Sequence, residues 1–492
     1  MGRDVPAIVV SPQDRRLYRE KVRRCLDVFA RMLQESRFAD GPQQVGLEIE
    51  FSLVDESGTP AMRSPEVLAA IDDPGWAPEL GLFNVEVNLA PRPLAGSALA
   101  DLEHLAADCL AHGDERAQKA GARLAMIGIL PTLRQRDATV DAMSPNPRYR
   151  LLNEQMCVAR GEEMRLSIDG AERLVAHLGS IMAEAACTSI QCHLRVSPEK
   201  FGSYWNAAQA VAGVQVALAA NSPFLFGRQL WEETRIAVFQ QAIDTRSDEL
   251  QAQGVRPRVW FGERWITSVF DLFEENLRYF PALLPLCEDE DPVAELEHGG
   301  TPALAELTLH NGTVYRWNRP VYAVDNGEPH LRVENRVLPA GPTVTDVMAN
   351  AAFYYGLVYM LAEAERPIWS QMSFAAARDN LMEAARHGID ASVYWPGLGE
   401  VGVAELTLRR LLPLAREGLR RWQVDSGHAD RMLSVIEQRC LTGRTGSTWQ
   451  ADTVRVLEER HGLSRSDALR EMTQLYLTLM HAGEPVHTWP VD

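Results

Sequence analysis

Acidic side chains lie inside two short apolar runs, and in the first run two of them are two positions apart. Glu48 and Glu50 lie in "VGLEIEF", and Glu86 lies in "FNVEVNLAP". An unpaired carboxylate is costly to bury, so such residues need a cation or another partner if these runs are buried strands. Two carboxylates on one face of a strand lie roughly 7 Å apart, and carboxylate oxygens are ligands that Mg²⁺ prefers. The spacing therefore predicts a magnesium site made by Glu48, Glu50 and Glu86.

Two later runs also carry hydrogen-bonding or ionisable side chains at alternate positions. They are Gln191, His193 and Arg195 in "SIQCHLRVS", and Arg332, Glu334 and Arg336 in "LRVENRVL". His193 and Glu334 are candidates for a second metal position, and the three arginines are candidate ligands of phosphate or carboxylate oxygens. A hydrogen-bonded core histidine also explains His193, and a structural ion pair also explains Glu334 with Arg336.

The four runs read as strands that each have one apolar and one polar face, because successive side chains of a strand point to opposite sides. A solvated antiparallel sheet with one wet face explains any one of these strands. Together, however, their polar faces carry Glu, Asn, His and Arg and no Lys. This composition favours a cleft in which acids and arginines share a ligand.

Apolar residues at helical spacing predict the other elements. Helices are expected at residues 12–36, 97–120, 171–186, 203–220 and 343–365. From about residue 374 the chain contains amphipathic, Arg- and Glu-rich segments without comparable strands. We therefore expect an α+β catalytic domain over residues 1–373, including the N-terminal helix, and a helical C-terminal region over residues 374–492. The acidic stretch 287–300 is expected to be a solvated loop, with a mobile flap as the alternative.

Composition excludes several classes of partner. The 492 residues are 46% hydrophobic and 24% charged, as in an ordinary globular protein, and the net charge of −18 opposes binding to nucleic acid or an anionic membrane. Seven cysteines without a C-x-x-C pair argue against a disulfide framework and a thiolate zinc site. With no apolar signal segment at the start, a cytoplasmic location is expected.

Two further segments have simple structural interpretations. Residues 347–362 are uncharged, but they are fewer than the ~20 residues that cross a bilayer, so we expect a buried core helix. The "GLGEVG" segment at 397–402 matches a dinucleotide-binding pattern but lacks its surrounding strand and helix, and we expect a turn that leads into a helix. No P-loop is present.

Seven segments, in order, carry a family resemblance. They are "GLEIEF", "PELGLFNVEVNLAP", "SPNPRYRLLNEQM", "IQCHLRVS", "HNGTVYRWNRPVY", "RVENRVLPAG" and "TGSTWQ". This set, spread over roughly residues 44–450, resembles the bacterial carboxylate-amine ligases related to glutamate-cysteine ligase. The resemblance implies a glutamine synthetase-like fold. In that fold a curved, mainly antiparallel sheet forms a funnel-shaped active site with helices on its outer face.

The resemblance also implies roles for individual residues. The metal ligands would be Glu48, Glu50, Glu79, Glu86, His193 and Glu334. Glu50 and Arg336 would be catalytic, with Arg336 binding the transferred phosphate. Arg148 and Tyr149 would contact the substrate, and Arg319 would contact the polyphosphate of the nucleotide. Arg195 and Arg332 are expected to bind substrate or nucleotide because of their place on the polar strand faces, not because of the resemblance. The family often carries a second histidine two positions after the first, where this chain has Arg195.

The activity implied is that of an ATP-dependent ligase that uses Mg²⁺, or Mn²⁺ in its place. ATP would phosphorylate a carboxylate, with the γ-carboxyl of glutamate as the expected donor, and an amine such as cysteine would displace phosphate from the acyl phosphate. A guanidino-type phosphotransferase is the first alternative, although such enzymes rely more on arginine than on carboxylates. A catalytically silent nucleotide-binding scaffold is the second. A homo-oligomer is an open alternative to a monomer.

Overall fold

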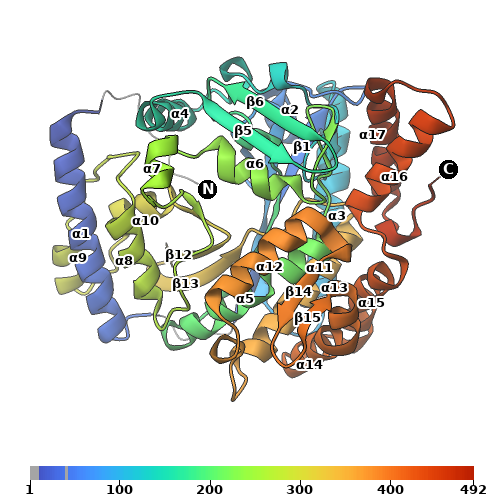
Figure 1. Cartoon of the computed structure of the whole chain (residues 1–492). Coiled ribbons are helices and arrows are strands. Elements are labelled where there is room, and N and C mark those ends of the chain that lie inside the picture. Colours follow the sequence, from blue (N-terminus) through green and yellow to red (C-terminus); the bar gives the residue numbers. More distant parts are fainter. Residues whose placement is uncertain (1–9, 39–42, 492) are drawn as a thin grey trace.

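The computed structural model describes residues 10–38 and 43–491 (Figure 1). A seven-stranded sheet has the order β12-β13-β7-β1-β3-β2, with β4 paired to the end of β1. Its strands are β1 (Gln44–Val54), β2 (Trp76–Pro78), β3 (Asn84–Pro93), β4 (Arg123–Ala125), β7 (Ile190–Arg195), β12 (Asn318–Asp325) and β13 (Glu328–Asn335). All neighbouring strands of this sheet are antiparallel, and the sheet curls into a half-barrel. The expected curved antiparallel sheet is therefore confirmed.

The register of the strands brings their polar side chains to one face. Glu50 of β1 lies opposite Glu86 of β3, and Glu334 of β13 lies opposite His193 of β7. Arg319 of β12 is paired with Glu334 in turn. Because residues directly opposite in a ladder point to the same side, the polar faces of these strands form one continuous surface.

Two helices cover the opposite, apolar face of the sheet. They are α5 (Pro198–Ala219) and α11 (Val344–Ala362), and most residues of each are buried. The Tyr355 hydroxyl of α11 donates hydrogen bonds to the carbonyls of Gly46 (3.0 Å) and His193 (3.3 Å), which ties this helix to β1 and β7. The uncharged run at 347–362 is thus a buried core helix, as expected. Within the described residues, no helix is both long and apolar enough to cross a bilayer.

Helix α1 (Pro12–Gln34) begins where its sequence signals predict. The Ser11 side chain accepts a hydrogen bond from the Asp14 amide, and the Asp14 carboxylate accepts one from the Ser11 amide, which completes a capping box. Pro12 occupies the first helical position, where no amide donor is needed. The helix packs against α8 (Val269–Tyr279), α9 (Pro292–Glu297) and α10 (Ala305–Asn311) at one edge of the molecule (Figure 1).

The remaining elements surround the sheet. The helices are α2 (Ser64–Ile71), α3 (Ala98–Lys119), α4 (Pro147–Arg160), α6 (Thr234–Ala242) and α7 (Asp248–Ala252). The small strand pairs are β5–β6 (Met164–Asp169, Arg173–Leu178), β8–β9 (Phe224–Leu225, Arg228–Gln229) and β10–β11 (Val259–Trp260, Tyr315–Arg316). The helices expected at 12–36, 97–120, 203–220 and 343–365 correspond to α1, α3, α5 and α11.

The helix expected at residues 171–186 is wrong. This segment forms strand β6, which pairs with β5, followed by the short 3₁₀ turn Glu184–Ala186. In β6 the side chains of Leu174, Ala176 and Leu178 are buried and alternate with exposed ones. That period of two belongs to a strand that is half buried, and it overrides the weaker helical spacing.

The C-terminal region is helical, as expected, apart from one hairpin. Its helices are α12 (Phe374–His387), α13 (Val403–Leu406), α14 (Leu412–Arg421), α15 (Ser426–Thr442), α16 (Gly446–Glu459) and α17 (Arg465–Ala482). The "GLGEVG" segment forms the turn and second strand of the hairpin β14–β15 (Ser392–Trp395, Gly399–Gly402), and α13 follows directly. Helices α14 and α15 pack on α11, and their buried side chains join the same apolar core as the sheet.

The acidic stretch 287–300 is only partly a loop. It contains α9, whose first turn is capped by the Asp291 carboxylate, and Pro292 and Leu296 are buried. Helix formation here follows from an N-cap aspartate followed directly by proline.

Candidate active site

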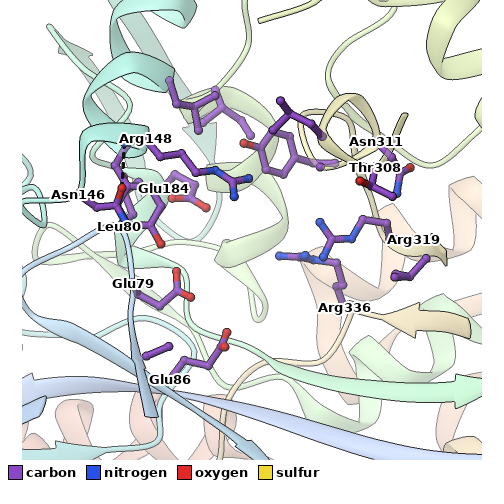
Figure 2. Close-up of a pocket in the computed structure, with 18 of the residues that line it drawn as sticks. Glu79, Leu80, Glu86, Asn146, Arg148, Glu184, Thr308, Asn311, Arg319 and Arg336 are labelled. Carbon is purple, nitrogen blue, oxygen red and sulfur yellow. Dashed lines mark hydrogen bonds between the residues drawn. The ribbon is translucent and has the colours of Figure 1, made fainter. Parts of the chain in front are cut away.

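The polar face of the sheet forms one wall of a cavity of about 1340 Å³. Strand residues that line it are Glu48, Glu50, Glu86, Arg319 and Arg332, with Arg336 just beyond the end of β13. The segments that close over the sheet contribute Glu79, Arg148, Tyr149 and Glu184. In Figure 2 the acids Glu79 and Glu86 point into this cavity from one side, and the guanidinium groups of Arg319 and Arg336 point toward them from the other.

Three of the acids form a close cluster. Carboxylate oxygens of Glu50, Glu79 and Glu86 all lie within 4.8 Å of one another. Burial raises the pKa of Glu86 to about 7, with a further contribution from the charges of Glu48 and Glu50. Burial, and then the charges of Glu86 and Glu50, raise the pKa of Glu79 well above its ordinary value. An oxygen-only donor set under mutual repulsion fits a hard divalent cation such as Mg²⁺ or Mn²⁺.

Glu50 is held in place by the start of β7. Its two carboxylate oxygens accept hydrogen bonds from the Ser189 amide (2.6 Å) and from the Gln191 side-chain amide (2.9 Å). Burial raises the pKa of Glu50, although the nearby charge of Arg336 opposes this shift. The carboxylate is thus oriented before any ligand binds, which is a property that catalytic groups need.

His193 lies beside Glu48 and outside the three-acid cluster. Its Nε2 is 3.0 Å from Glu48 Oε1, and its Nδ1 accepts a hydrogen bond of 3.0 Å from Nε of Arg332. Burial raises the pKa of Glu48, but the charge of His193 and the contact with it lower the pKa to a net value below the ordinary one. Both ring nitrogens therefore face protein groups, and a metal-ligand role for His193 remains a prediction.

Glu334 organises the arginines on the other side of the cavity. This residue is 1% exposed, and its carboxylate accepts hydrogen bonds from Arg319 Nη2 (2.8 Å) and Arg336 Nη1 (2.7 Å). Burial alone would raise the pKa of Glu334, but these two guanidinium groups hold it far below its ordinary range. The structure thus contains the ion pair that was one of the two interpretations of Glu334 and Arg336. A metal-ligand role for Glu334 remains a prediction.

Arg148 and Tyr149 reach the cavity from the first turn of α4. Asn146 caps this helix by accepting a hydrogen bond of 2.8 Å from the Arg148 amide, and Pro147 is the first helical residue. Figure 2 shows the Arg148 side chain extending into the cavity near Glu184. The Tyr149 hydroxyl donates to the Pro78 carbonyl at 3.3 Å. Both residues thus lie where a substrate could contact them.

Arg195 is not brought to this cavity. It is the last residue of β7, it lies opposite Arg332 in the ladder, and it lines a second cavity of about 320 Å³ beside Lys200 and Glu363. Its position at the end of the strand places it beyond the edge of the shared polar surface. A role for Arg195 in binding substrate or nucleotide remains a prediction.

Two functional candidates were missed in the sequence. Glu184 lines the cavity, and burial, with the charge of Glu50, raises its pKa to about 7, against the opposing charge of Arg336. It was not singled out because it lies within residues 171–186, which were expected to form a helix. Arg235, at the start of α6, also lines the cavity although it is only 3% exposed. The one signal for Arg235 was a charged "EETR" inside an otherwise apolar stretch.

Comparisons with known proteins agree with this geometry. Glutamate-cysteine ligase from Francisella tularensis, solved in complex with AMP, superposes with a TM-score of 0.54 and 13% identity over 93% of this chain and 97% of that one. A bifunctional glutathione synthetase from Pasteurella multocida gives a TM-score of 0.52 and 12% identity over 93% of this chain and 55% of that one. At such identities these structures show a shared fold. No curated protein sequence is similar enough to match this chain.

Family membership comes from the sequence match. A model of the family described as glutamate-cysteine ligase family 2 matches residues 44–471, which include every strand of the main sheet and the cavity acids Glu48, Glu50, Glu79, Glu86 and Glu184. The chain therefore belongs to glutamate-cysteine ligase family 2 and is an ATP-dependent carboxylate-amine ligase.

Proposed function

We propose that this ligase joins the γ-carboxyl group of glutamate to an amine, with cysteine as the first acceptor to test, and that it requires Mg²⁺. The observation that carries the proposal is the opposition of three close acids, Glu50, Glu79 and Glu86, to two oriented arginines across a single cavity. In such a site the acids bind the cation and the arginines bind the polyphosphate chain.

The acid cluster is the proposed cation site. Mg²⁺ held by Glu50, Glu79 and Glu86 would neutralise charge on the ATP phosphates and so favour phosphoryl transfer. Gln191 and Ser189 hold Glu50 with hydrogen bonds, so this ligand needs little reorganisation. Glu48, beside His193, lies next to the cluster and could take part in a second cation site.

The arginine pair is the proposed site of the transferring phosphoryl group. Glu334 fixes the directions of Arg319 and Arg336, so their donors are in place before charge develops on the phosphoryl oxygens. Donors that are oriented in advance lower the barrier, because the protein does not reorganise during the reaction. Burial alone would lower the pKa of Arg336, but the charges of Glu334 and Glu50 raise it above its usual range, so this guanidinium stays charged.

The proposed reaction has two steps. A carboxylate oxygen of glutamate attacks the γ-phosphorus of ATP, the bond to ADP breaks, and an acyl phosphate forms. The amine nitrogen attacks the acyl carbon, phosphate leaves with the electron pair of the broken C–O bond, and the nitrogen loses a proton. Arg148 and Tyr149 are proposed to contact the amino acid substrate from α4. No protein nucleophile takes part in these steps.

An isotope experiment tests the proposal. Purified protein is incubated with Mg-ATP, glutamate labelled with ¹⁸O in its γ-carboxyl group, and cysteine or another amine from a panel. We expect phosphate release only when an accepted amine is present, one ¹⁸O atom in the released phosphate, and an amide of matching mass. ADP with a stable phosphorylated acceptor would instead indicate the guanidino-type phosphotransferase. Nucleotide binding without turnover for any pair would indicate the silent scaffold.

A further inference from the structure

The first turn of α16, with its N-cap Thr445, packs closely against the buried Asn221. In the segment Thr445–Gln450, "TGSTWQ", the Gln450 side-chain amide donates to Asn221 Oδ1 at 2.8 Å, and the Ser447 amide donates to the Ala220 carbonyl at 2.9 Å. A Cβ atom on Gly446 would lie 2.0 Å from Asn221 Oδ1. Only glycine allows this approach, so the turn and Asn221 hold each other in position.

Asn221 also binds a buried carboxylate, that of Glu233. Its backbone amide donates to Glu233 Oε2 at 2.9 Å, and its side-chain amide donates to the Ala340 carbonyl (2.7 Å) and to the Tyr476 hydroxyl (2.9 Å). Asn221 and Glu233 are both fully buried. The other oxygen of Glu233, Oε1, accepts a hydrogen bond of 3.0 Å from Nε of Arg235. Glu233 is therefore a bridge between Asn221 and Arg235.

Arg235 in turn holds the backbone next to the cavity. Its Nη1 donates to the Arg336 carbonyl at 3.4 Å, and its Nη2 donates to the Val337 carbonyl. Strand β13 ends at Asn335, so these carbonyls have left the sheet ladder. The Arg336 amide is held separately, by the Trp317 carbonyl at 2.9 Å. Arg235 thus takes the place of a neighbouring strand for the backbone carbonyl of Arg336, whose guanidinium points into the cavity.

We infer that Arg235 is a positioning residue for Arg336, and that Glu233, Asn221 and the Thr445–Gln450 turn hold Arg235 in place. The inference rests on the proposed phosphoryl-binding role of Arg336. It gives the C-terminal helices a part in the active site, because α16 begins at Gly446 within this turn. Displacing a catalytic group by about 1 Å can slow a reaction by ~100-fold, so a residue that fixes the Arg336 backbone influences the rate strongly.

The first test replaces Arg235 with Lys. Arg235→Lys keeps the charge beside Glu233 but loses the planar fork that reaches two carbonyls at once. We expect kcat to fall by ~10–100-fold, with KM for glutamate nearly unchanged, because the affected group acts on the transferring phosphoryl. In the double variant Arg235→Lys/Arg336→Lys, kcat should be no lower than in Arg336→Lys alone, since the first residue acts through the second.

A matched control separates positioning from stability. Arg439 is also buried, 1% exposed against 3% for Arg235, and its guanidinium pairs with Asp346 at 2.7 Å. Arg439→Lys should lower the melting temperature but leave kcat and KM unchanged at temperatures where the variant is folded. If Arg235→Lys does not fold, Gln450→Met replaces it. We expect Gln450→Met to lower kcat by ~3–10-fold, because the amide that holds Asn221 is lost.

The outcomes distinguish two failures. Unchanged kcat in the folded Arg235→Lys protein, or a double variant whose losses multiply, would overturn the inference while leaving the active site in place. Unchanged kcat in Gln450→Met would show that the Thr445–Gln450 turn does not contribute to the positioning of Arg235. If Arg336→Lys itself turns over at the wild-type rate, the proposed function of Arg336 fails, and the positioning role fails with it.

Discussion

Replacing Glu86 with Gln should change the stability of the protein in opposite directions with and without metal. At pH 8, above the pKa of about 7 to which burial raises Glu86, this carboxylate is charged beside Glu50 and Glu79. Two unit charges 4.8 Å apart repel each other by about 3 kcal/mol at an effective dielectric constant of 20. Glu86→Gln removes this repulsion and keeps the oxygen that accepts the hydrogen bond from Asn88. The metal-free variant should therefore be more stable than the metal-free wild type.

Metal should reverse the order. A cation at 100 times its dissociation constant stabilises the folded wild type by about 2.7 kcal/mol. For a chain of 492 residues, an unfolding entropy of roughly 2.1 cal/mol/K per residue makes 1 kcal/mol equal to about 1 °C in melting temperature. We thus expect Mg²⁺ to raise the wild-type melting temperature by about 3 °C. We expect Glu86→Gln to start up to about 3 °C higher and to gain little from Mg²⁺.

Differential scanning calorimetry at pH 8, with EDTA and then with a Mg²⁺ series, measures both effects. Glu115→Gln is the matched control, because Glu115 is exposed on α3 and does not line the cavity. It should melt like the wild type under both conditions. A Glu86→Gln protein that melts lower without metal, or that gains as much from Mg²⁺ as the wild type, would contradict a cation site at this cluster.

Three further variants test other parts of the site and the fold. Glu50→Gln should abolish product formation while its circular dichroism spectrum stays native, and measurable turnover would refute its assigned role. Glu334→Gln should lower kcat by ~100–1000-fold, because Arg319 and Arg336 lose the carboxylate that orients them, and wild-type kinetics would contradict this. Burial lowers the pKa of His310 to about 4 in the folded protein. Well above pH 6.5 this imidazole is neutral in both the folded and the unfolded state. As the pH falls below 6.5 the unfolded chain binds a proton first, so the free energy of unfolding decreases. Between pH 7.5 and 5 the loss should be about 2 kcal/mol by urea unfolding, and His310→Gln should show a shallower decline; an equal decline would exclude His310 as the cause.

The alternation of side chains along single strands could be read from the sequence alone. Glu48 and Glu50 share a face because neighbouring side chains of a strand point in opposite directions, whatever the strand packs against. The same local rule placed Arg332 with Glu334, and the helical period of apolar residues located α1, α3, α5 and α11. These features depend on residues that are close in sequence, so no knowledge of strand order is needed.

The meeting of distant segments was decided only by the tertiary structure. Glu79 joins Glu50 and Glu86 because β2 pairs with the far side of β3, and nothing in its own turn indicates that partner. Arg235 reaches the Arg336 backbone across 101 residues of chain. Distances of this kind depend on strand order, on register and on how helices close over the sheet, and these are properties of the packed chain as a whole.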